Sequence, residues 1–400
     1  MIDAKKEEPS ETCCPLCGSA TMEVFYEQAD VPASCNLLWT SKRAAVSCPK
    51  GNIRLAFCDA CSYIVNVALE PSKNQYTERY DNSLFFSNDF RTFTKKMATE
   101  LVQRFDLHNK RIVEIGGGKV DFLSDLCKIG NNHGVRLNPF DSDAARNKKR
   151  VSGSPRTAKA FTLTDSEKLN ADFAFSYHEL EHMNSPRAFL DALRKMLSNN
   201  PRVRFFFAVP NALKAFEDGC FADIIYEHVS YFTPASLASL FSLCGFDVLQ
   251  VEESRGSVFD SIYIEATIGN KKRKASFTSG SEQVRNTVAK FADKTSTIIE
   301  ENNGRIARLL DQGKRVVVWG TGARGVTLLN TFKDQRIEYA VDLNPRKQGM
   351  YVPGTGQRIV SPEFLRDHPP DFIVLANPSY EREIRDTVNN LGIETEFIKF

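Results

Sequence analysis

The sequence has no apolar run close to the ~18 residues that a membrane-spanning helix needs. Its first ten residues are charged and lack the apolar segment of a signal peptide. We therefore expect a cytoplasmic protein without membrane contacts. Positive and negative side chains nearly balance and leave a formal net charge of +2. This balance gives no electrostatic reason to expect nucleic acid as a partner.

The sequence also lacks internal repeats, and its 400 residues exceed what one ordinary hydrophobic core holds. From residue 111 to about 268, short apolar runs alternate with helical patterns, which predicts an α/β fold around a mostly parallel sheet. We expect strands at 111–115, 172–177, 203–209, 248–252 and 261–268, the last two as an antiparallel pair. We expect helices at 93–107 and 282–312, and a linker at 269–282.

Ten cysteines are present, and seven of them lie before residue 62. In a chain without a secretion signal, such crowding indicates metal binding rather than disulfides. Two C-x-x-C pairs can close a tetrahedral four-sulfur zinc site, which would be structural because no position remains for water or substrate. These ligands are Cys14, Cys17, Cys58 and Cys61, with Cys13, Cys35 and Cys48 as alternatives. Residues 1–70 carry six basic and nine acidic side chains, which disfavours a nucleic-acid-binding ribbon.

A glycine-rich turn follows the strand at 111–115 and precedes a helical pattern. Its glycines would let the backbone approach a bound nucleoside, although glycines also occur in purely structural turns. A carboxylate just before the turn could face the sulfonium end of S-adenosylmethionine, and an amide about twenty residues on stands where an acidic residue commonly binds ribose. The candidate cofactor residues are Glu114, Gly116, Gly117, Gly118 and Asn138.

Residues 178–182 read His-Glu-Leu-Glu-His, which matches the zinc-protease motif. That motif requires a helix, whereas here a strand precedes the five residues and the next helix begins later, with Ser185 as its N-cap. The segment is therefore predicted to be a loop at the carboxyl end of the central strand, where it would face cofactor and substrate. Its candidate cofactor-binding residues are His178, Glu181 and His182.

Residues 225–232 read Ile-Tyr-Glu-His-Val-Ser-Tyr-Phe and precede another helix. A histidine can accept a proton near neutral pH, and an adjacent carboxylate can hold its charge or its tautomer. His228 and Glu227 are therefore candidate catalytic residues, with two phenols, Tyr226 and Tyr231, beside them. A surface histidine in an aromatic turn is an equally good interpretation of the same pattern.

A second strand–glycine–helix unit begins at residue 316 and contains G-x-G-x-x-G, with Asp342 at the end of the next strand. Its glycines are Gly320, Gly322 and Gly325. This dinucleotide fingerprint makes an NAD-dependent oxidoreductase an alternative function. The stretch that follows is short for a complete NAD domain, and Arg324 could equally hold the phosphate of a sugar nucleotide.

In this order, the motifs resemble those of the three-domain sugar C-methyltransferases, the family of the TDP-4-keto sugar C3-methyltransferases. The resemblance also includes Tyr80 within Glu-Arg-Tyr-Asp-Asn-Ser and the stretch 341–356. It implies a zinc-binding domain at 1–70, an S-adenosylmethionine-dependent methyltransferase domain at 71–275, and a C-terminal Rossmann-like domain at 276–400 that binds the substrate's nucleotide.

The resemblance further implies a mechanism. His228, assisted by Glu227, would remove a proton next to a ketone of a nucleotide-linked sugar or related natural-product intermediate. The resulting enolate would attack the methyl group, and Tyr80 with Tyr226 or Tyr231 would hydrogen-bond the developing oxyanion. Methylation of oxygen or nitrogen in another small molecule remains an alternative, as does the oxidoreductase. We expect a monomer or a homodimer.

Overall fold

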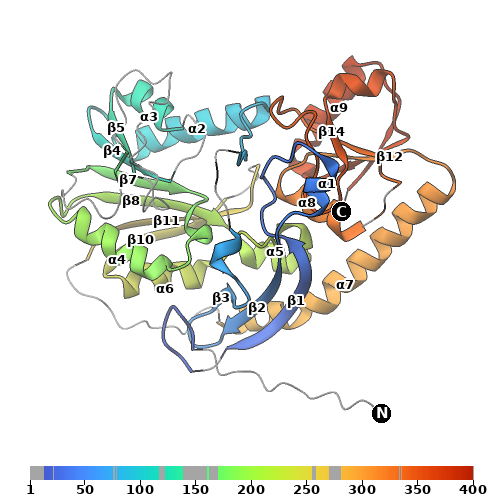
Figure 1. Ribbon diagram of the computed structural model, residues 1–400. Helices are drawn as coiled ribbons and strands as arrows, with labels where there is room; N and C mark the ends of the chain where they lie inside the picture. Colours follow the sequence, from blue (N-terminus) through green and yellow to red (C-terminus); the bar gives the residue numbers. More distant parts are fainter. Residues whose placement is uncertain are drawn as a thin grey trace, which may run out of the picture.

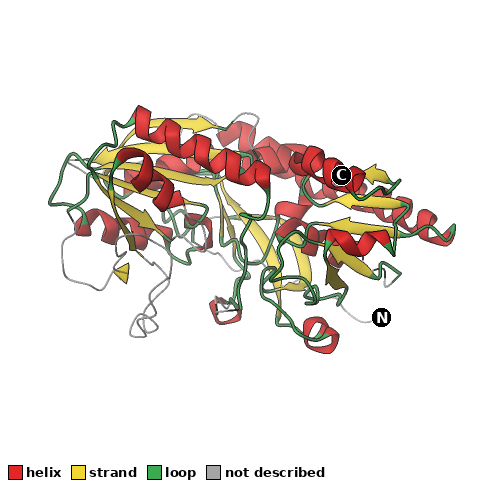
Figure 2. Cartoon of the chain, turned by 90° about the horizontal axis from the view of Figure 1, so that it is seen from above, coloured by secondary structure: helices red, strands yellow, loops and turns green. Residues whose placement is uncertain are grey.

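The computed structural model describes residues 13–20, 22–74, 77, 79–116, 122–137, 160–161, 170–254, 258–269, 281–332, 334 and 336–399. Three sheets organise these residues (Figure 1). Seen from above, the molecule is elongated, with the two larger sheets at opposite ends (Figure 2). Within the described part of the chain, every helix is too short or too polar to cross a lipid bilayer.

The largest sheet has seven strands. In spatial order they are β10 (Phe246–Glu253), β11 (Ser261–Ile268), β8 (Arg204–Pro210), β7 (Phe173–Tyr177), β4 (Arg111–Ile115), β5 (His133–Leu137) and β6 (Ala160–Phe161). The strands from β8 to β6 are parallel, and β11 runs antiparallel to β8 and to β10; the β10–β11 pair was predicted from the sequence. The strand order reverses direction at β4, and sheets of this kind bind ligands at the carboxyl ends of the strands beside such a switch point, which here are β4 and β7.

Four helices flank this sheet: α2 (Asn88–Arg104), α3 (Phe122–Gly130), α4 (Pro186–Met196) and α6 (Pro234–Leu243). The helix after β8, α5 (Ala212–Asp218), packs instead with the N-terminal strands. Helix α2 begins at Asn88 rather than at residue 93, because the Ser87 hydroxyl caps it by accepting from the Phe90 N–H. Helix α6 starts at a capping box between Thr233 and Ser236. These caps fix where the loops that lead to the site end.

The second sheet has four antiparallel strands, in the order β1 (Glu23–Pro32), β2 (Lys50–Cys58), β3 (Tyr63–Asn66) and β9 (Ser230–Tyr231), with the short helix α1 (Lys42–Val46) between β1 and β2. Three strands come from the cysteine-rich segment, whereas β9 lies more than 160 residues later in the chain. Ile64 pairs with Tyr231, so the segment after His228 completes the N-terminal sheet.

The third sheet has five parallel strands, in the order β14 (Arg358–Val360), β13 (Tyr339–Val341), β12 (Val316–Trp319), β15 (Phe372–Leu375) and β16 (Glu396–Ile398), flanked by α8 (Ala323–Phe332) and α9 (Glu381–Asn390). The long helix α7 (Ser281–Asp311) leads into it and packs on both β1 and α5 (Figure 1). Phe291 of α7 is fully buried against Phe216 and Tyr26, which joins the helix to the other two sheets. Most of the predicted linker, 270–280, lies outside the described residues.

Candidate functional site

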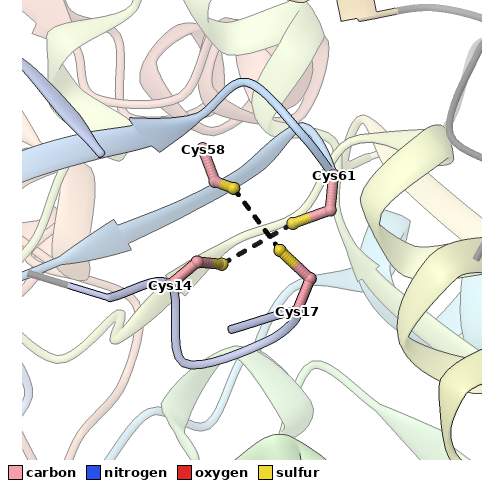
Figure 3. Close-up of side chains that lie close together, drawn as sticks. All are labelled: Cys14, Cys17, Cys58 and Cys61. Atoms are coloured by element: carbon pink, nitrogen blue, oxygen red, sulfur yellow. Dashed lines mark hydrogen bonds between the residues drawn. The ribbon is translucent and has the colours of Figure 1, made fainter. Parts of the chain in front are cut away.

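Four cysteines converge beside the β2–β3 hairpin (Figure 3). The Sγ atoms of Cys14 and Cys61 are 3.6 Å apart, as are those of Cys17 and Cys58. A tetrahedron with Zn–S bonds of ~2.3 Å has edges of ~3.8 Å, so the four sulfurs fit a zinc ion. Of the alternative ligands, Cys35 lies instead against Glu227, and Cys13 is exposed.

Gly116 directly follows β4, where the strand order of the seven-stranded sheet reverses direction. Its φ of +77° lies in the left-handed region, and a side chain there would overlap the side chain of Glu179. Glu114, which is 3 % exposed, accepts from Arg136 Nε at 2.6 Å. Its carboxylate is therefore paired with a cation on β5. The candidate residues Gly117, Gly118 and Asn138 lie outside the described residues.

The His-Glu-Leu-Glu-His segment, 178–182, starts as a loop and ends in a single 3-10 turn, Leu180–His182. Helix α4 begins only at Pro186. The prediction that it is not a protease helix is thus confirmed. His178 has a φ of +53°, which is unusual for a residue with a side chain. Its ring stacks on Tyr177 with centroids 4.3 Å apart, and its Nε2 lies 3.0 Å from Ser261 Oγ. Burial lowers the pKa of His178 to about 3.

His182 and His228 form a histidine corner at the end of this loop. His182 Nδ1 is 3.0 Å from the backbone oxygen of Glu227, so Nδ1 carries the proton of the neutral imidazole. The two rings are 4.9 Å apart between centroids, at an angle of 69°. Burial lowers the pKa of His182 to about 4 and holds that of His228 well below 6.5. Both imidazoles are therefore neutral at neutral pH and can accept a proton.

Glu181 lies next to the histidine corner. It is 1 % exposed, and neither carboxyl oxygen has a hydrogen-bond partner among the described residues. Its Oε1 is 4.0 Å from Nε2 of His182. One carboxyl oxygen of Glu181 and one ring nitrogen from each of His182 and His228 all lie within 4.8 Å of one another. Burial, and then the charge of Glu179, raise the pKa of Glu181 well above 4.5.

The Glu227 carboxylate is bound to the N-terminal segment. It accepts from the Cys35 N–H at 2.9 Å and the Ser34 hydroxyl at 3.2 Å, and Tyr80 also hydrogen-bonds to it. Burial raises its pKa despite these donors. The sequence did not single out Ser34 or predict Cys35 in this role, because nothing local links residues 34–35 to a glutamate almost 200 positions away.

The two tyrosines beside the predicted base are occupied elsewhere. The Tyr226 hydroxyl accepts from the Glu70 N–H at 2.7 Å, and its ring is fully buried against Gly51. The Tyr231 hydroxyl donates to the Ile225 oxygen at 2.9 Å and accepts from the Ile225 N–H at 3.1 Å. The Tyr231 hydroxyl therefore braces the turn that precedes His228, and the Tyr226 hydroxyl ties this loop to the backbone of Glu70. Tyr80 is the predicted tyrosine that the structure brings to the polar corner.

The second glycine loop follows β12 at the switch point of the five-stranded sheet. Gly320 has a φ of +100°, and a side chain at Gly325 would overlap the Gly320 oxygen. Asp342 accepts from the Thr321 N–H at 2.8 Å and so fixes the loop. A Cβ at Gly322 would meet open space.

The Arg324 guanidinium forms an ion pair with a carboxylate that no sequence motif indicated. Its Nε and Nη2 donate to the two oxygens of Asp223, at 2.5 and 2.7 Å. Lys347, 5 % exposed, donates to the Thr321 oxygen at 2.9 Å and to Asn36 Oδ1 at 3.2 Å. These contacts fasten the second glycine loop to the other two sheets.

The matches to known proteins separate the part of the chain with the seven-stranded sheet from the part with the five-stranded sheet. Residues 90–251 match a methyltransferase domain, and residues 274–398 match the C-methyltransferase C-terminal domain. The strand order of the large sheet, with β11 antiparallel, is that of a class I methyltransferase. The C-methyltransferase NovU of Streptomyces niveus is 25 % identical over 320 residues, which cover 73 % of this chain and 74 % of that protein.

The chain thus joins a methyltransferase domain to a C-methyltransferase C-terminal domain, and it is an S-adenosylmethionine-dependent methyltransferase. Solved structures with similarity include 1,6-didemethyltoxoflavin-N1-methyltransferase of Burkholderia thailandensis, 12 % identical, covering 44 % of this chain and 79 % of that chain with a TM-score of 0.33. Magnesium protoporphyrin IX methyltransferase of Synechocystis PCC 6803 is 13 % identical, covering 47 % and 86 %, with a TM-score of 0.32. The match to the C-methyltransferase C-terminal domain includes the second glycine loop. It therefore favours a methyltransferase over the NAD-dependent oxidoreductase.

Proposed function

We propose that this C-methyltransferase moves the methyl group of S-adenosylmethionine to a carbon next to a ketone, in a nucleotide-linked sugar or a related natural-product intermediate. The observation that carries the proposal is the continuity between the first glycine turn and the histidine corner. Gly116 lies against Glu179, and the same loop continues to His182, whose ring faces His228. Cofactor and base would thus meet at the carboxyl ends of β4 and β7.

Carbon methylation requires a base, because the acceptor carbon must lose a proton before it can attack the methyl group. His228 suits this role because its burial keeps the imidazole neutral. The Glu227 backbone oxygen fixes the tautomer of His182, and the Glu227 carboxylate anchors the loop. Tyr80 hydrogen-bonds Glu227, and its hydroxyl would turn from this carboxyl group to the enolate oxygen to stabilise it.

The remaining parts of the chain support this corner. The four cysteines would hold a structural zinc that fixes the β2–β3 hairpin, and β3 pairs with β9 directly after the base. The loop from Gly320 to Gly325 would hold the nucleotide end of the acceptor, with Asp342 shaping it. We assign 1–70 to the zinc-binding domain, 71–275 to the methyltransferase domain and 276–400 to the nucleotide-binding domain. The pairing of Ile64 with Tyr231 supports the packing of the first two as one unit.

The experiment uses a TDP-4-keto sugar and methyl-13C-labelled S-adenosylmethionine. We expect S-adenosylhomocysteine and a methylated sugar whose 13C chemical shift is that of a methyl group on carbon. A methyl shift typical of oxygen or nitrogen would replace the proposal by the corresponding alternative. Reduction of NAD without methyl transfer would replace it by an oxidoreductase.

The residue test replaces the base while keeping the size of the side chain. His228→Asn should lower kcat by about 10²- to 10⁴-fold, the usual contribution of a general base, and should leave S-adenosylhomocysteine binding intact. His108→Asn is the matched control, because His108 is exposed and lies outside the site. Normal turnover by His228→Asn would remove this residue as the base.

A further inference from the structure

Glu181 is a buried carboxyl group for which the mechanism above has no use. Carboxylates are rarely buried without partners, because an unpaired charge loses its hydration. Here neither oxygen has a hydrogen-bond partner among the described residues, yet the carboxyl group lies within 4.8 Å of two imidazoles at the candidate site. His182 donates its Nδ1–H to the Glu227 backbone oxygen, and its Nε2 is the nitrogen that lies 4.0 Å from Glu181. The group is therefore placed to exchange a proton rather than to bind a fixed donor.

We propose that Glu181 is the final proton acceptor of the reaction, acting as a positioning residue through His228. The C–H bond of the acceptor breaks, its electron pair stays on carbon as the enolate, and the proton forms an N–H bond on one nitrogen of His228. The opposite nitrogen of His228 gives its proton to a Glu181 oxygen. The enolate carbon then forms a bond to the methyl carbon while the S–CH₃ pair returns to sulfur. This inference rests on the proposed function.

The relative basicities favour this direction of transfer. An imidazole whose pKa lies well below 6.5 binds a proton weakly, whereas a carboxylate whose pKa is raised by burial binds it strongly. The transfer also turns a buried anion into a neutral group, which removes the cost of burying its charge. The separation of at most 4.8 Å is within reach of one bridging water or a rotation of the carboxyl group.

The proposal sets the pH dependence, because Glu181 must be ionised to accept a proton. Activity should rise with pH through the raised pKa of Glu181, not through that of a histidine. The described titratable groups that surround the pair are Tyr177, His178, Glu179, His182, Glu227 and His228. Because the site titrates as a coupled set, the assignment must come from substitutions.

The first experiment needs no acceptor, so it can fail or succeed independently of the proposed function. In protein labelled with δ-13C-glutamate, NMR should show a carboxyl titration well above 4.5 that disappears in Glu181→Gln. Glu227→Gln should remove a different raised signal. Glu179→Gln is the matched control, and should keep the Glu181 signal but lower its midpoint, because it removes a neighbouring negative charge.

The second experiment measures kcat/KM against pH with the TDP-4-keto sugar. The acidic limb should follow the midpoint of the Glu181 signal, and Glu181→Gln should lose that limb together with about 10²-fold or more of the rate. A Glu181 signal near 4.5, an unchanged limb in Glu181→Gln, or His228 protonated at neutral pH in 15N NMR would each overturn the proposal. So would a second tightly bound metal ion that the Gln variant loses.

Discussion

At the scale of single residues, burial decides which groups of this site carry charge. His178, His182 and His228 are kept neutral, whereas Glu181 and Glu227 are pushed toward their protonated forms. The unfolded chain has no such preference. Stability must therefore depend on pH through these residues.

His178 gives the clearest pH prediction. Its pKa is about 3 in the folded protein and 6.5 in a free histidine, so between these values the unfolded chain binds more protons. Its contribution to stability is therefore present above 6.5 and is lost as pH falls toward 3. His178→Asn, which tolerates the positive φ, should lose this dependence. The check is the difference in Tm between wild type and variant from pH 7.5 to pH 5, with the exposed His133→Asn as control. A constant difference would contradict it.

The tyrosines separate structural from functional hydroxyls. Tyr226→Phe loses the bond to the Glu70 N–H and should cost about 1 kcal/mol of unfolding free energy, with turnover preserved. Tyr80→Phe loses its bond to Glu227 and should lower kcat. Urea unfolding and steady-state turnover of the two variants make the comparison. Equal losses of kcat would show that this division is wrong.

Neighbouring residues in the sequence predicted that 178–182 and 225–228 are loops, but they did not predict the direction of every side chain. His228 and Glu227 lie on the same loop, and the Glu227 carboxylate binds the 34–35 segment. Glu181, a predicted cofactor-binding residue, is buried beside the histidines. Side-chain direction depends on packing against distant residues, which a single sequence does not contain.

At the scale of elements, caps and periodicity determined most of the boundaries. The strands at 111–115 and 261–268 were predicted to the residue, and α7 begins and ends within one residue of expectation. The two-residue strand β9 was not predicted, because its only signal is pairing with β3. That pairing links the cysteine cluster to the loop that carries His228.

Loss of the proposed zinc site tests this link. Cys17→Ser should abolish one equivalent of bound zinc and loosen the β2–β3 hairpin, so that β9 loses its partner strand. Turnover should fall much more than affinity for S-adenosylhomocysteine, because the first glycine turn belongs to another sheet. Cys13→Ser, at an exposed position outside the cluster, is the matched control. Full turnover without zinc would contradict the link.

At the scale of the whole molecule, buried polar contacts join the three sheets. The ion pair between Arg324 and Asp223 connects α8 to the 3-10 turn after α5, and Lys347 joins Asn36 to Thr321. The sequence predicted Arg324 as a phosphate ligand. It could not predict the ion pair with Asp223, because that residue is 101 positions away. Motifs in the sequence predicted the three-part organisation. The contacts that join the parts could be identified only from the structure.

Breaking this ion pair should weaken the attachment of the C-terminal sheet. Asp223→Asn leaves the Arg324 guanidinium without its counter-charge, and should cost about 1–3 kcal/mol. Chemical unfolding followed by tryptophan fluorescence is informative, since Trp319 lies on β12 of that sheet. We expect an earlier or a separate transition for it. Lys96→Met, which breaks only an exposed pair with Glu100, should leave the curve unchanged.

The most direct measurement of the central claim is a crystal structure with S-adenosylhomocysteine. We predict the ligand on the turn that starts at Gly116, with its sulfur directed along the 178–182 loop toward His228. That geometry would place the methyl group of the cofactor where a carbon deprotonated by His228 can attack it. A ligand seated on the Gly320 loop, or a sulfur directed away from the histidine corner, would contradict the account.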